Sequence, residues 1–360
     1  MAQFGIFLAS PAVAAAYSAV ATHQASGVTY RIEQQSNRVA ASTEAVKACH
    51  AAHPREVDVC ALTELAGKPI ITAVDIKSRV SAHPHPLYLW RFDANGSTVH
   101  LAGSIHILPP GFYPLPRQFE DAFDQSDYLV LEVDTTQTPP ATLQALSIKH
   151  AQLPVTMNLR HLLPKTTYSQ LANTLGEYGV DLQHFARLKP NFVTQQLALL
   201  ALLSVGYDPE SGLESHFRKK KAQRPILQLE TVAFQLELLF DMTLETQVQM
   251  TQAMLEQIPD FEIATADLLT AWLAGDDTSF AAAIDAQSGD TPELIAFGES
   301  LIQARNQGMA DTLTKYLQRP GNYFVLIGSA HLIGEEGVPN LLAKAGYKGI
   351  RYQSNSSVTN

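Results

Sequence analysis

Two copies of one short pattern carry the residue types best suited to chemistry. Gly103-Ser104-Ile105-His106 and Gly328-Ser329-Ala330-His331 each follow an apolar, strand-like run. Ligands of open α/β sheets bind at the carboxyl ends of strands, so a histidine just past a strand is expected to face that crevice. One such pattern alone is typical of a hydrogen-bonded structural histidine, but its repetition predicts a shared site. The predicted site residues are His106 and His331, with Gly103, Ser104, Gly328 and Ser329 in support.

Glutamates end two further apolar runs. Glu132 follows Tyr128-Leu129-Val130-Leu131, and Glu230 follows Pro225-Ile226-Leu227-Gln228-Leu229. A buried carboxylate is costly unless it is paired, hydrogen-bonded or bound to a metal. Two histidines with one or two glutamates form a set that suits manganese, cobalt, zinc or iron. We expect both glutamates in the catalytic set and Glu132 among the metal ligands. The alternatives are a salt bridge from Glu132 to an arginine, and a helix N-terminus favoured by the charge of Glu230.

Arg305 and Asn306 lie within an expected helix and extend the predicted site. An arginine fork can orient a carboxylate or bind a substrate carbonyl; the alternative is a helix surface that faces solvent. The sequence has no HExxH pattern, which excludes a zincin. It also has no GxSxG pattern, so nothing supports a covalent acyl mechanism.

The elements that must position these residues follow from the apolar patterns. Asn95-Gly96 between two β-rich runs predicts a tight hairpin. Residues 139–203 and much of 230–286 predict helices, interrupted by prolines and glycines. Strands that alternate with helices indicate an α/β sheet with a large helical insertion. The other expected elements are strands over 87–92, 98–105, 127–133, 225–229, 323–327 and 349–352, and helices over 292–317 and 338–345.

The N-terminal part of the chain differs in pattern. Residues 1–25 are apolar and rich in small side chains, as in a signal peptide, although no lysine or arginine precedes the apolar run. Residues 24–40 indicate a polar linker, and we expect order to begin near Thr43. Residues 26–82 contain the two cysteines, Cys49 and Cys60, which we expect to form a disulfide across a helical hairpin. The alternative is two reduced, buried thiols.

Composition limits the classes of function. The chain has 360 residues, 46% hydrophobic and 17% charged, which is typical of a folded protein. Its net charge of −10 argues against nucleic acid as a partner. Beyond the first thirty residues no apolar run is long enough for a transmembrane helix. The expected signal peptide and disulfide indicate an extracytoplasmic protein, periplasmic or secreted, and we expect one main domain over residues 83–354. Its oligomeric state does not follow from the sequence.

The ordered motifs resemble those of the TraB/GumN group, which includes the PrgY and Tiki proteins. The resemblance spans roughly residues 87–352 and leaves out the N-terminal segment. It rests on several landmarks that occur in order: Leu89-Trp90, Gly103-Ser104-Ile105-His106, Leu131-Glu132, Leu188-Lys189-Pro190, Gly212-Leu213-Glu214, Leu229-Glu230-Thr231, Arg305-Asn306 and Gly328-Ser329-Ala330-His331-Leu332.

This resemblance implies a fold and a site. The fold would be a central mixed sheet of the erythromycin esterase/ChaN-like type, with a large helical insertion and a small N-terminal helical appendage. Tiki members are metal-dependent proteases that favour manganese or cobalt. By position, the ligand or catalytic trio would be His106, Glu132 and His331, with Glu230 and Glu214 as additions.

Three functions remain open on the sequence alone. The first is a metal-dependent hydrolase, in which a divalent ion activates water and polarises the scissile carbonyl. The second is a hydrolase in which a histidine activates water without a metal, oriented by a glutamate. The third is a binding protein for haem, iron or a peptide, without turnover. The expected substrate is a peptide or another small extracytoplasmic compound.

Overall fold

The computed structural model describes residues 16–56, 59–221, 223–289 and 291–354. The chain forms two compact units, and each unit is assembled from segments distant in sequence. The first unit contains the described part of Met1–Thr72 together with Thr135–Tyr207 and Val232–Glu262. The second contains Ala73–Asp134, Asp208–Thr231 and the described part of Ile263–Asn360.

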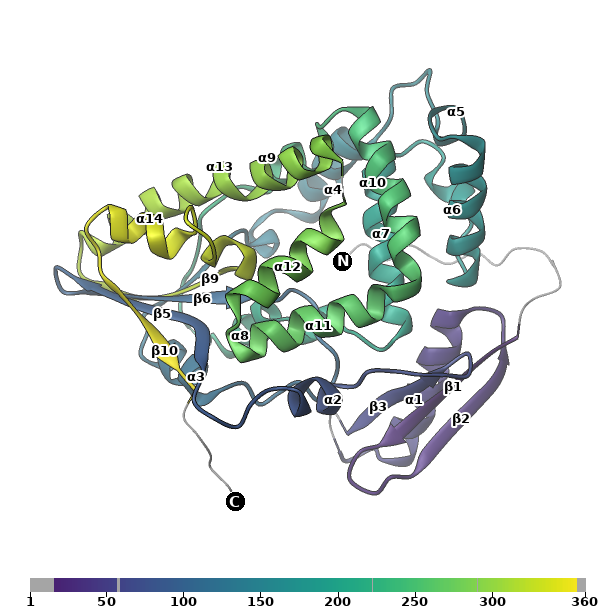
Figure 1. Cartoon of the computed structure of the whole chain (residues 1–360), viewed down its shortest axis with the longest axis horizontal. Coiled ribbons are helices and arrows are strands. Elements are labelled where there is room, and N and C mark those ends of the chain that lie inside the picture. Colours follow the sequence, from purple (N-terminus) through teal and green to yellow (C-terminus); the bar gives the residue numbers. More distant parts are fainter. Residues whose placement is uncertain (1–15, 57–58, 222, 290, 355–360) are drawn as a thin grey trace. The chain divides into compact units, whose positions relative to one another are not determined.

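The second unit is built on a mixed sheet of the order β10-β5-β6-β9-β7-β8 (Figure 1). Strands β6, β9, β7 and β8 are parallel, while β5 is antiparallel to both β6 and β10. This arrangement confirms the predicted α/β class, whereas the erythromycin esterase type stays a prediction. The strands are β5 (Pro86–Ala94), β6 (Ser97–Ser104), β7 (Tyr128–Leu131), β8 (Ile226–Gln228), β9 (Gly321–Gly328) and β10 (Gly349–Gln353).

Helices cover both faces of this sheet. In Figure 1, α13 and α14 lie on one side of the sheet and α3 and α8 on the other. Phe123 of α3 and Phe217 of α8 both contact Phe324 of β9, with ring centroids 5.4 and 4.7 Å apart. Parallel strands are normally buried on both faces in this way. The helices of this unit are α2 (Ala73–Ser78), α3 (Arg117–Asp124), α8 (Leu213–Lys220), α12 (Asp277–Ser288), α13 (Pro292–Leu317) and α14 (Val338–Lys344), and α11 (Phe261–Ala274) lies largely within it.

Local sequence signals account for most elements of the second unit. Asn95 and Gly96 have φ values of 51° and 74° and form the two-residue turn between β5 and β6. Thr291 caps α13 by accepting a hydrogen bond from the backbone N–H of Leu294, and proline follows this cap at the first helical position. The predicted hairpin and the predicted bounds of this long helix are therefore confirmed.

The register of the parallel strands determines which residues lie side by side where the strands end. Gly103 of β6 is paired with Ile327 of β9, and Ser104 is paired with Gly328. Leu131 of β7 is paired with Leu326 of β9 and with Gln228 of β8. The chain segments that follow these four strands consequently start at one edge of the sheet.

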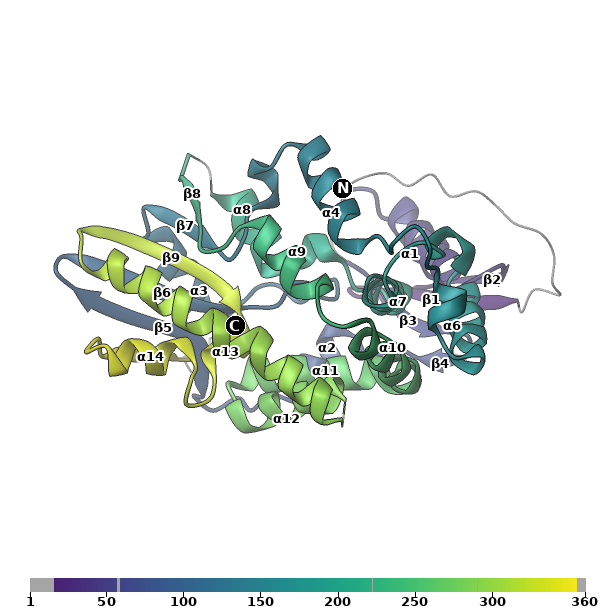
Figure 2. The ribbon, with the colours of Figure 1, turned by 90° about the horizontal axis from the view of Figure 1, so that it is seen from above.

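The first unit combines an antiparallel sheet, of order β2-β1-β3-β4, with most of the helical insertion. Its helical core includes Leu171, Leu197 and Met254, which belong to α6, α7 and α10. Its strands are β1 (Tyr17–His23), β2 (Thr29–Gln35), β3 (Cys60–Leu65) and β4 (Lys68–Pro69). Its helices are α1 (Arg38–Ala52), α4 (Pro140–Ala151), α5 (Leu159–Leu162), α6 (Lys165–Glu177), α7 (Pro190–Ser204), α9 (Val232–Phe240) and α10 (Leu244–Gln257). Figure 2 shows this unit from above.

The predicted helical appendage is wrong in its secondary structure. Among the described residues of this segment, α1 and the short α2 are helical, and β2, β3 and β4 join β1 in a sheet, so the predicted linker over 24–40 contains β2 and the start of α1. The turns explain the difference, because Gly27 has a positive φ between β1 and β2, and Ala66 and Gly67 have positive φ between β3 and β4. The many polar residues of β2 hid its strand character.

The N-terminal segment and the helical insertion belong to one unit. Helix α1 packs on α7, where the hydroxyl of Ser42 donates a hydrogen bond to the backbone carbonyl of Ser204. A Cβ on Gly179 would meet the side chain of Asn37 at 2.5 Å, which shows how closely these segments approach. This grouping differs from the predicted segments, which placed the whole insertion with the main sheet in residues 83–354.

The expected leader lies mostly outside the described residues, which begin at residue 16. Tyr17–His23 forms β1, which is hydrogen-bonded to β2 on one side and β3 on the other. Removal of residues 1–25 would therefore remove an inner strand of this sheet. Within the described part of the chain, the helices are too short or too polar to cross a membrane.

The structure places Cys49 and Cys60 at disulfide distance, as the sequence predicted, but the bond joins helix α1 to strand β3 and not two helices of a hairpin. The bond closes a loop with a sequence separation of 11 residues. A loop of this length restricts the unfolded chain enough to contribute about 2–4 kcal/mol to the free energy of unfolding.

We expect reduction of this disulfide to lower the free energy of unfolding of the first unit by about 2–4 kcal/mol. Urea denaturation with and without reductant measures the change. The chain has only two cysteines, so the double variant Cys49→Ser/Cys60→Ser should have the unfolding midpoint of the reduced protein. Adding reductant should not change that midpoint. Equal unfolding midpoints for the reduced and oxidised wild type would contradict the prediction.

Candidate active site

The carboxyl edge of the second unit's sheet gathers the predicted site residues. Strand β6 leads to His106, β9 to His331, β7 to Glu132 and β8 to Glu230. Helix α13 brings Arg305 and Asn306 to the same edge. The two copies of the glycine, serine and histidine pattern follow neighbouring parallel strands, β6 and β9. Both histidines therefore lie at one edge of the sheet.

His331 is a buried, neutral histidine with a fixed orientation. It lies in a short 3-10 helix, Ser329–Leu332, and is only 2% exposed. Its Nδ1 atom lies 2.6 Å from Oδ1 of Asn306, whose amide nitrogen donates to the carbonyl of Glu336. This geometry places the proton on Nδ1 and leaves the Nε2 lone pair facing Glu132, 3.9 Å away. Burial lowers the pKa of His331 to about 4.

His106 has the opposite environment. Its side chain is exposed, and its Nδ1 atom lies 2.7 Å from Oε1 of Glu214 on α8. The negative charge of Glu214 outweighs desolvation and raises the pKa of His106 to about 9. Burial raises the pKa of Glu214, but the positive charge of His106 lowers it by more, to about 2. At neutral pH this pair is an imidazolium with a carboxylate, opposite in charge state to His331.

Close packing holds the His106–Glu214 pair in place. Gly212 precedes α8, and a Cβ at this position would lie only 2.2 Å from the carbonyl oxygen of His106. Phe217, one turn after Glu214, packs against Phe324 of β9 and so fixes the helix on the sheet. Sequence reasoning missed this role of Gly212, although the residue belonged to a recognised landmark.

A single arginine joins the two strand-end glutamates. Arg305 donates from Nε to Glu230 at 2.8 Å, and from Nη2 to Glu230 at 2.7 Å and to Glu132 at 2.5 Å. The second oxygen of Glu132 accepts the backbone N–H of Gly328. Burial raises the pKa of Glu132, but the positive charges of Arg305 and His106 and the hydrogen bond from Gly328 lower it by more, so its pKa lies below the ordinary value. The expected alternative of a salt bridge at Glu132 is therefore present.

The reactive atoms converge above Gly328. A Cβ on this glycine would lie 3.2 Å from Oε1 of Glu132, 3.6 Å from Cδ2 of His331 and 3.9 Å from Nε2 of His106. The absence of a side chain at this position keeps a small space open between the two histidines and the glutamate. The trio predicted from the sequence thus surrounds one point.

The remaining predicted residues support this arrangement. Ser329 donates a hydrogen bond from its hydroxyl to the carbonyl of Ser104 at 3.0 Å, which ties the two histidine segments together. A Cβ on Gly103 would lie 2.6 Å from the hydroxyl of Ser329, so glycine is needed for the close approach. The backbone carbonyl of Glu336 accepts a hydrogen bond from Asn306. The sequence could not predict this contact, because any residue type has a backbone carbonyl.

The donor set fits a metal ion only in part. Each histidine has its Nδ1 atom held by another side chain, the arrangement that directs Nε2 of a metal-bound histidine toward the ion. Glu132, however, already binds a guanidinium and a backbone N–H. Among the described residues, His106, Glu132 and His331 do not form a group whose ligand atoms all lie within 4.8 Å of one another. As arranged here, the trio does not fit a three-ligand metal site.

A groove of about 610 Å³ lies beside His331, between α12, α13 and the segment 333–336. Its wall includes Ala330, the neighbour of His331, and Asn306, which holds Nδ1 of His331. Its lining alternates aliphatic and acidic side chains: Ile284, Ile295, Ile302 and Ile333 with Asp285, Glu299, Glu335 and Glu336. The groove therefore suits a ligand with apolar and basic groups.

We expect Gly328→Ala to lower kcat by about 10-fold or more, because its methyl group would displace Glu132 and fill the space between the histidines. The backbone of Gly328, with φ of −52°, tolerates alanine, so the unfolding temperature should change little. Gly308→Ala is the matched control, since its Cβ would meet nothing within 4 Å. Wild-type kcat in Gly328→Ala would show that this space is not where substrate reacts.

Comparison with known proteins agrees with the motifs. The chain is 26% identical over 257 residues to the uncharacterized protein YbaP of Escherichia coli (strain K12), covering 68% of this chain and 87% of the relative. The protein of the same name from Shigella flexneri gives the same values. No solved structure shows a significant match. The model of the TraB/PrgY/gumN family matches residues 88–349, and the chain therefore belongs to that family.

Proposed function

We propose that this chain is a hydrolase that uses His331 and His106 as a base and an acid. The observation that carries the proposal is that two histidines on one sheet edge have different partners at Nδ1: the amide of Asn306 for buried His331, and the carboxylate of Glu214 for His106. These surroundings displace their pKa values in opposite directions, to about 4 for His331 and about 9 for His106. Neighbouring titratable groups whose environments separate their pKa values are typical of acid–base catalysis. The space above Gly328 brings both rings within reach of one bound group.

The charge states suggest an order of proton transfers. A water molecule between His331 and Glu132 attacks the substrate carbonyl, and Nε2 of His331 accepts its proton. The imidazolium of His106 then gives its proton to the leaving group as the carbon–heteroatom bond breaks. Transfer of the first proton from His331 to His106 through solvent restores the starting state. Atoms and charges balance with water as the only co-substrate.

Glu132, Arg305 and Glu230 act as a positioning set in this proposal. Arg305 holds both carboxylates, so Glu132 stays ionised and can orient the attacking water through the oxygen nearest His331. Glu230 is fixed by two hydrogen bonds from the same guanidinium and acts through Arg305. The predicted catalytic role of Glu230 becomes a positioning role.

The groove beside His331 favours a peptide substrate. Its aliphatic and acidic lining suits chain segments that contain apolar and basic side chains. Anionic substrates would be repelled by Asp285, Glu299, Glu335 and Glu336. The disulfide fits an oxidising compartment, so we place the reaction outside the cytoplasm.

We expect kcat/KM to follow a bell-shaped pH profile, measured with a fluorogenic peptide library and with 4-nitrophenyl esters. Activity requires neutral His331, so it falls as pH drops through about 4. It also requires protonated His106, so it falls as pH rises through about 9. Glu214→Gln removes the charge that raises the pKa of His106, and should move the alkaline limb down by about one to two pH units.

Glu210→Gln is the control for this shift. Glu210 is an exposed glutamate just before α8, and its contacts are with Ser215 and Lys219. An alkaline limb that moves equally in both variants, or in neither, would contradict the assignment of His106 as the acid. Binding of peptides without any turnover would instead favour a non-enzymatic binding protein.

A metal requirement, suggested by the resemblance to Tiki proteins, is tested separately. We expect activity to persist after dialysis against a chelator, because Arg305 already neutralises Glu132. Assays of the dialysed protein, with and without added manganese or cobalt, measure this. Loss of activity on dialysis and its recovery with either ion would replace the metal-free mechanism with the metal-dependent one.

A further inference from the structure

A second histidine and glutamate cluster lies in the first unit, outside the segment that the family model matches. His23 is the last residue of β1, His53 follows the end of α1, and Glu56 lies in the loop before β3. One ligand atom from each of these residues lies within 4.8 Å of the other two. No other described histidine, cysteine and carboxylate side chains form such a group.

The disulfide restricts the position of the loop that carries two residues of this cluster. Cys49 on α1 and Cys60 at the start of β3 close the loop that carries His53 and Glu56. Cys60 is also the residue paired with His23 in the antiparallel ladder of β1 and β3. The bond therefore sets the loop directly beside His23, whose side chain is only 4% exposed.

The distances match those of ligands around one small ion. Nε2 of His23 lies 3.2 Å from Oε2 of Glu56, and Nδ1 of His53 lies 3.5 Å from Oε1 of the same carboxylate. Tetrahedral ligands at the usual zinc distances are separated from one another by roughly 3.3 Å. The cluster is thus already close to the size of a zinc site.

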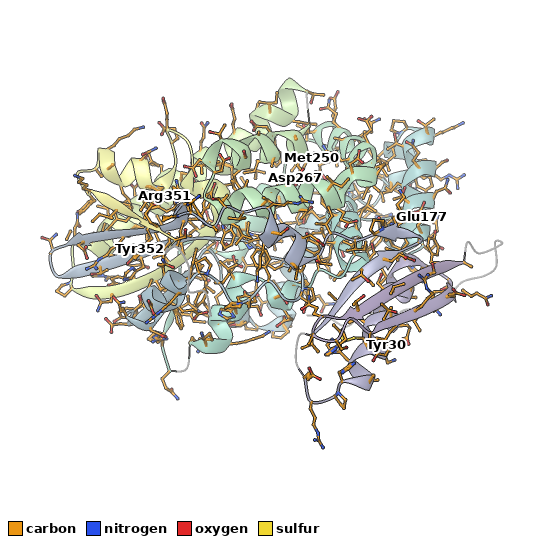
Figure 3. All side chains as sticks on the ribbon, turned by 60° about the horizontal axis from the view of Figure 1, so that its bottom comes forward. Tyr30, Glu177, Met250, Asp267, Arg351 and Tyr352 are labelled. Atoms are coloured by element: carbon orange, nitrogen blue, oxygen red, sulfur yellow. A yellow bond between two sulfur atoms is a disulfide. The ribbon has the colours of Figure 1, made fainter. Side chains whose placement is uncertain are left out.

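The outer nitrogens of both rings are held by hydroxyl groups. Nδ1 of His23 lies 2.7 Å from the hydroxyl of Ser26, and Nε2 of His53 lies 2.9 Å from the hydroxyl of Tyr30. Tyr30 lies on strand β2 of the first unit's sheet (Figure 3). The hydroxyl of Tyr30 can accept the ring N–H of His53, which leaves Nδ1 of that ring unprotonated for a metal. Nδ1 of His23 instead accepts the backbone N–H of Ser26, so its Nε2 atom carries the proton and donates it to Glu56, and a bound ion would replace that proton.

The rings themselves must move to bind an ion. They are stacked face to face, with centroids 3.7 Å apart and an angle of 1° between their planes, so their lone pairs lie in two parallel planes and cannot meet at one point. His53 and Glu56 can adjust, because their side chains are 20% and 47% exposed while His23 is packed. Binding would therefore open the stack around a fixed His23.

We propose that His23, His53 and Glu56 bind one zinc-class divalent ion, with water as the fourth ligand. Two imidazoles with one carboxylate suit zinc and its neighbours, and do not suit calcium or magnesium, which prefer oxygen ligands. The site belongs to the first unit, the proposed hydrolytic site belongs to the second, and the zinc proposal does not depend on hydrolysis.

Equilibrium dialysis with Zn²⁺ on the full chain, disulfide intact, tests the proposal. The reference protein carries His106→Ala and His331→Ala, so that the hydrolytic site cannot contribute to the count. We expect it to bind one equivalent of zinc, unaffected by excess Mg²⁺. Adding His53→Ala or Glu56→Gln should weaken binding by at least about 100-fold, more than the loss of an outer partner.

His50→Ala is the matched control, because His50 lies in the last turn of α1 near the cluster but outside it. It should bind zinc as the reference protein does. Tyr30→Phe should weaken binding by about 10-fold, as expected for an outer partner. Equal zinc binding by the reference protein, His53→Ala and Glu56→Gln would overturn the proposal, as would a reference protein that binds no zinc.

Discussion

One guanidinium holds the carboxyl edge of the main sheet together. Arg305 binds the glutamates that follow two parallel strands, and both glutamates would be costly to bury without it. Because the guanidinium cannot lose its proton, this countercharge is permanent. Three carboxylates at this edge, including Glu214, face one guanidinium and one imidazolium, which leaves one net negative charge. That balance favours the protonated form of His106 and agrees with the acidic groove beside the site.

Two copies of one sequence pattern, differing only at their third residue, acquire different chemistry because their partners differ. His331 is buried against the amide of Asn306, whereas His106 is exposed and paired with the carboxylate of Glu214. The strand register also offsets the two copies by one residue, because Gly328 is paired with Ser104 and not with Gly103. Neither partner is near its histidine in sequence. The pattern predicts where the histidines lie, but the division into acid and base depends on contacts across 108 and 25 residues.

Much of the second unit could be predicted from the sequence because its signals are local. The turn at Asn95-Gly96 and the capped start of α13 each depend on a few adjacent residues. The gathering of His106, His331 and Glu132 could be predicted as well, since parallel strands end at one edge. The N-terminal sheet could not, because the apolar alternation of β2 is limited to Tyr30 and Ile32 and Ala66 adopts a positive φ that its residue type does not indicate. Close approaches such as that of Gly212 to His106 have no local signal either.

The two histidine and glutamate clusters differ in what neutralises the carboxylate. Glu132 accepts hydrogen bonds from a guanidinium and from a backbone N–H, so a divalent ion would have to displace or compete with an existing cation. Glu56 instead faces two imidazoles, and a metal ion could replace the proton between His23 and Glu56 without displacing a guanidinium. Residue types alone would rank the first cluster as the better metal site, because it matches the motif. Arg305 on α13 already neutralises Glu132, so the cluster of His23, His53 and Glu56 is the better candidate for a metal ion.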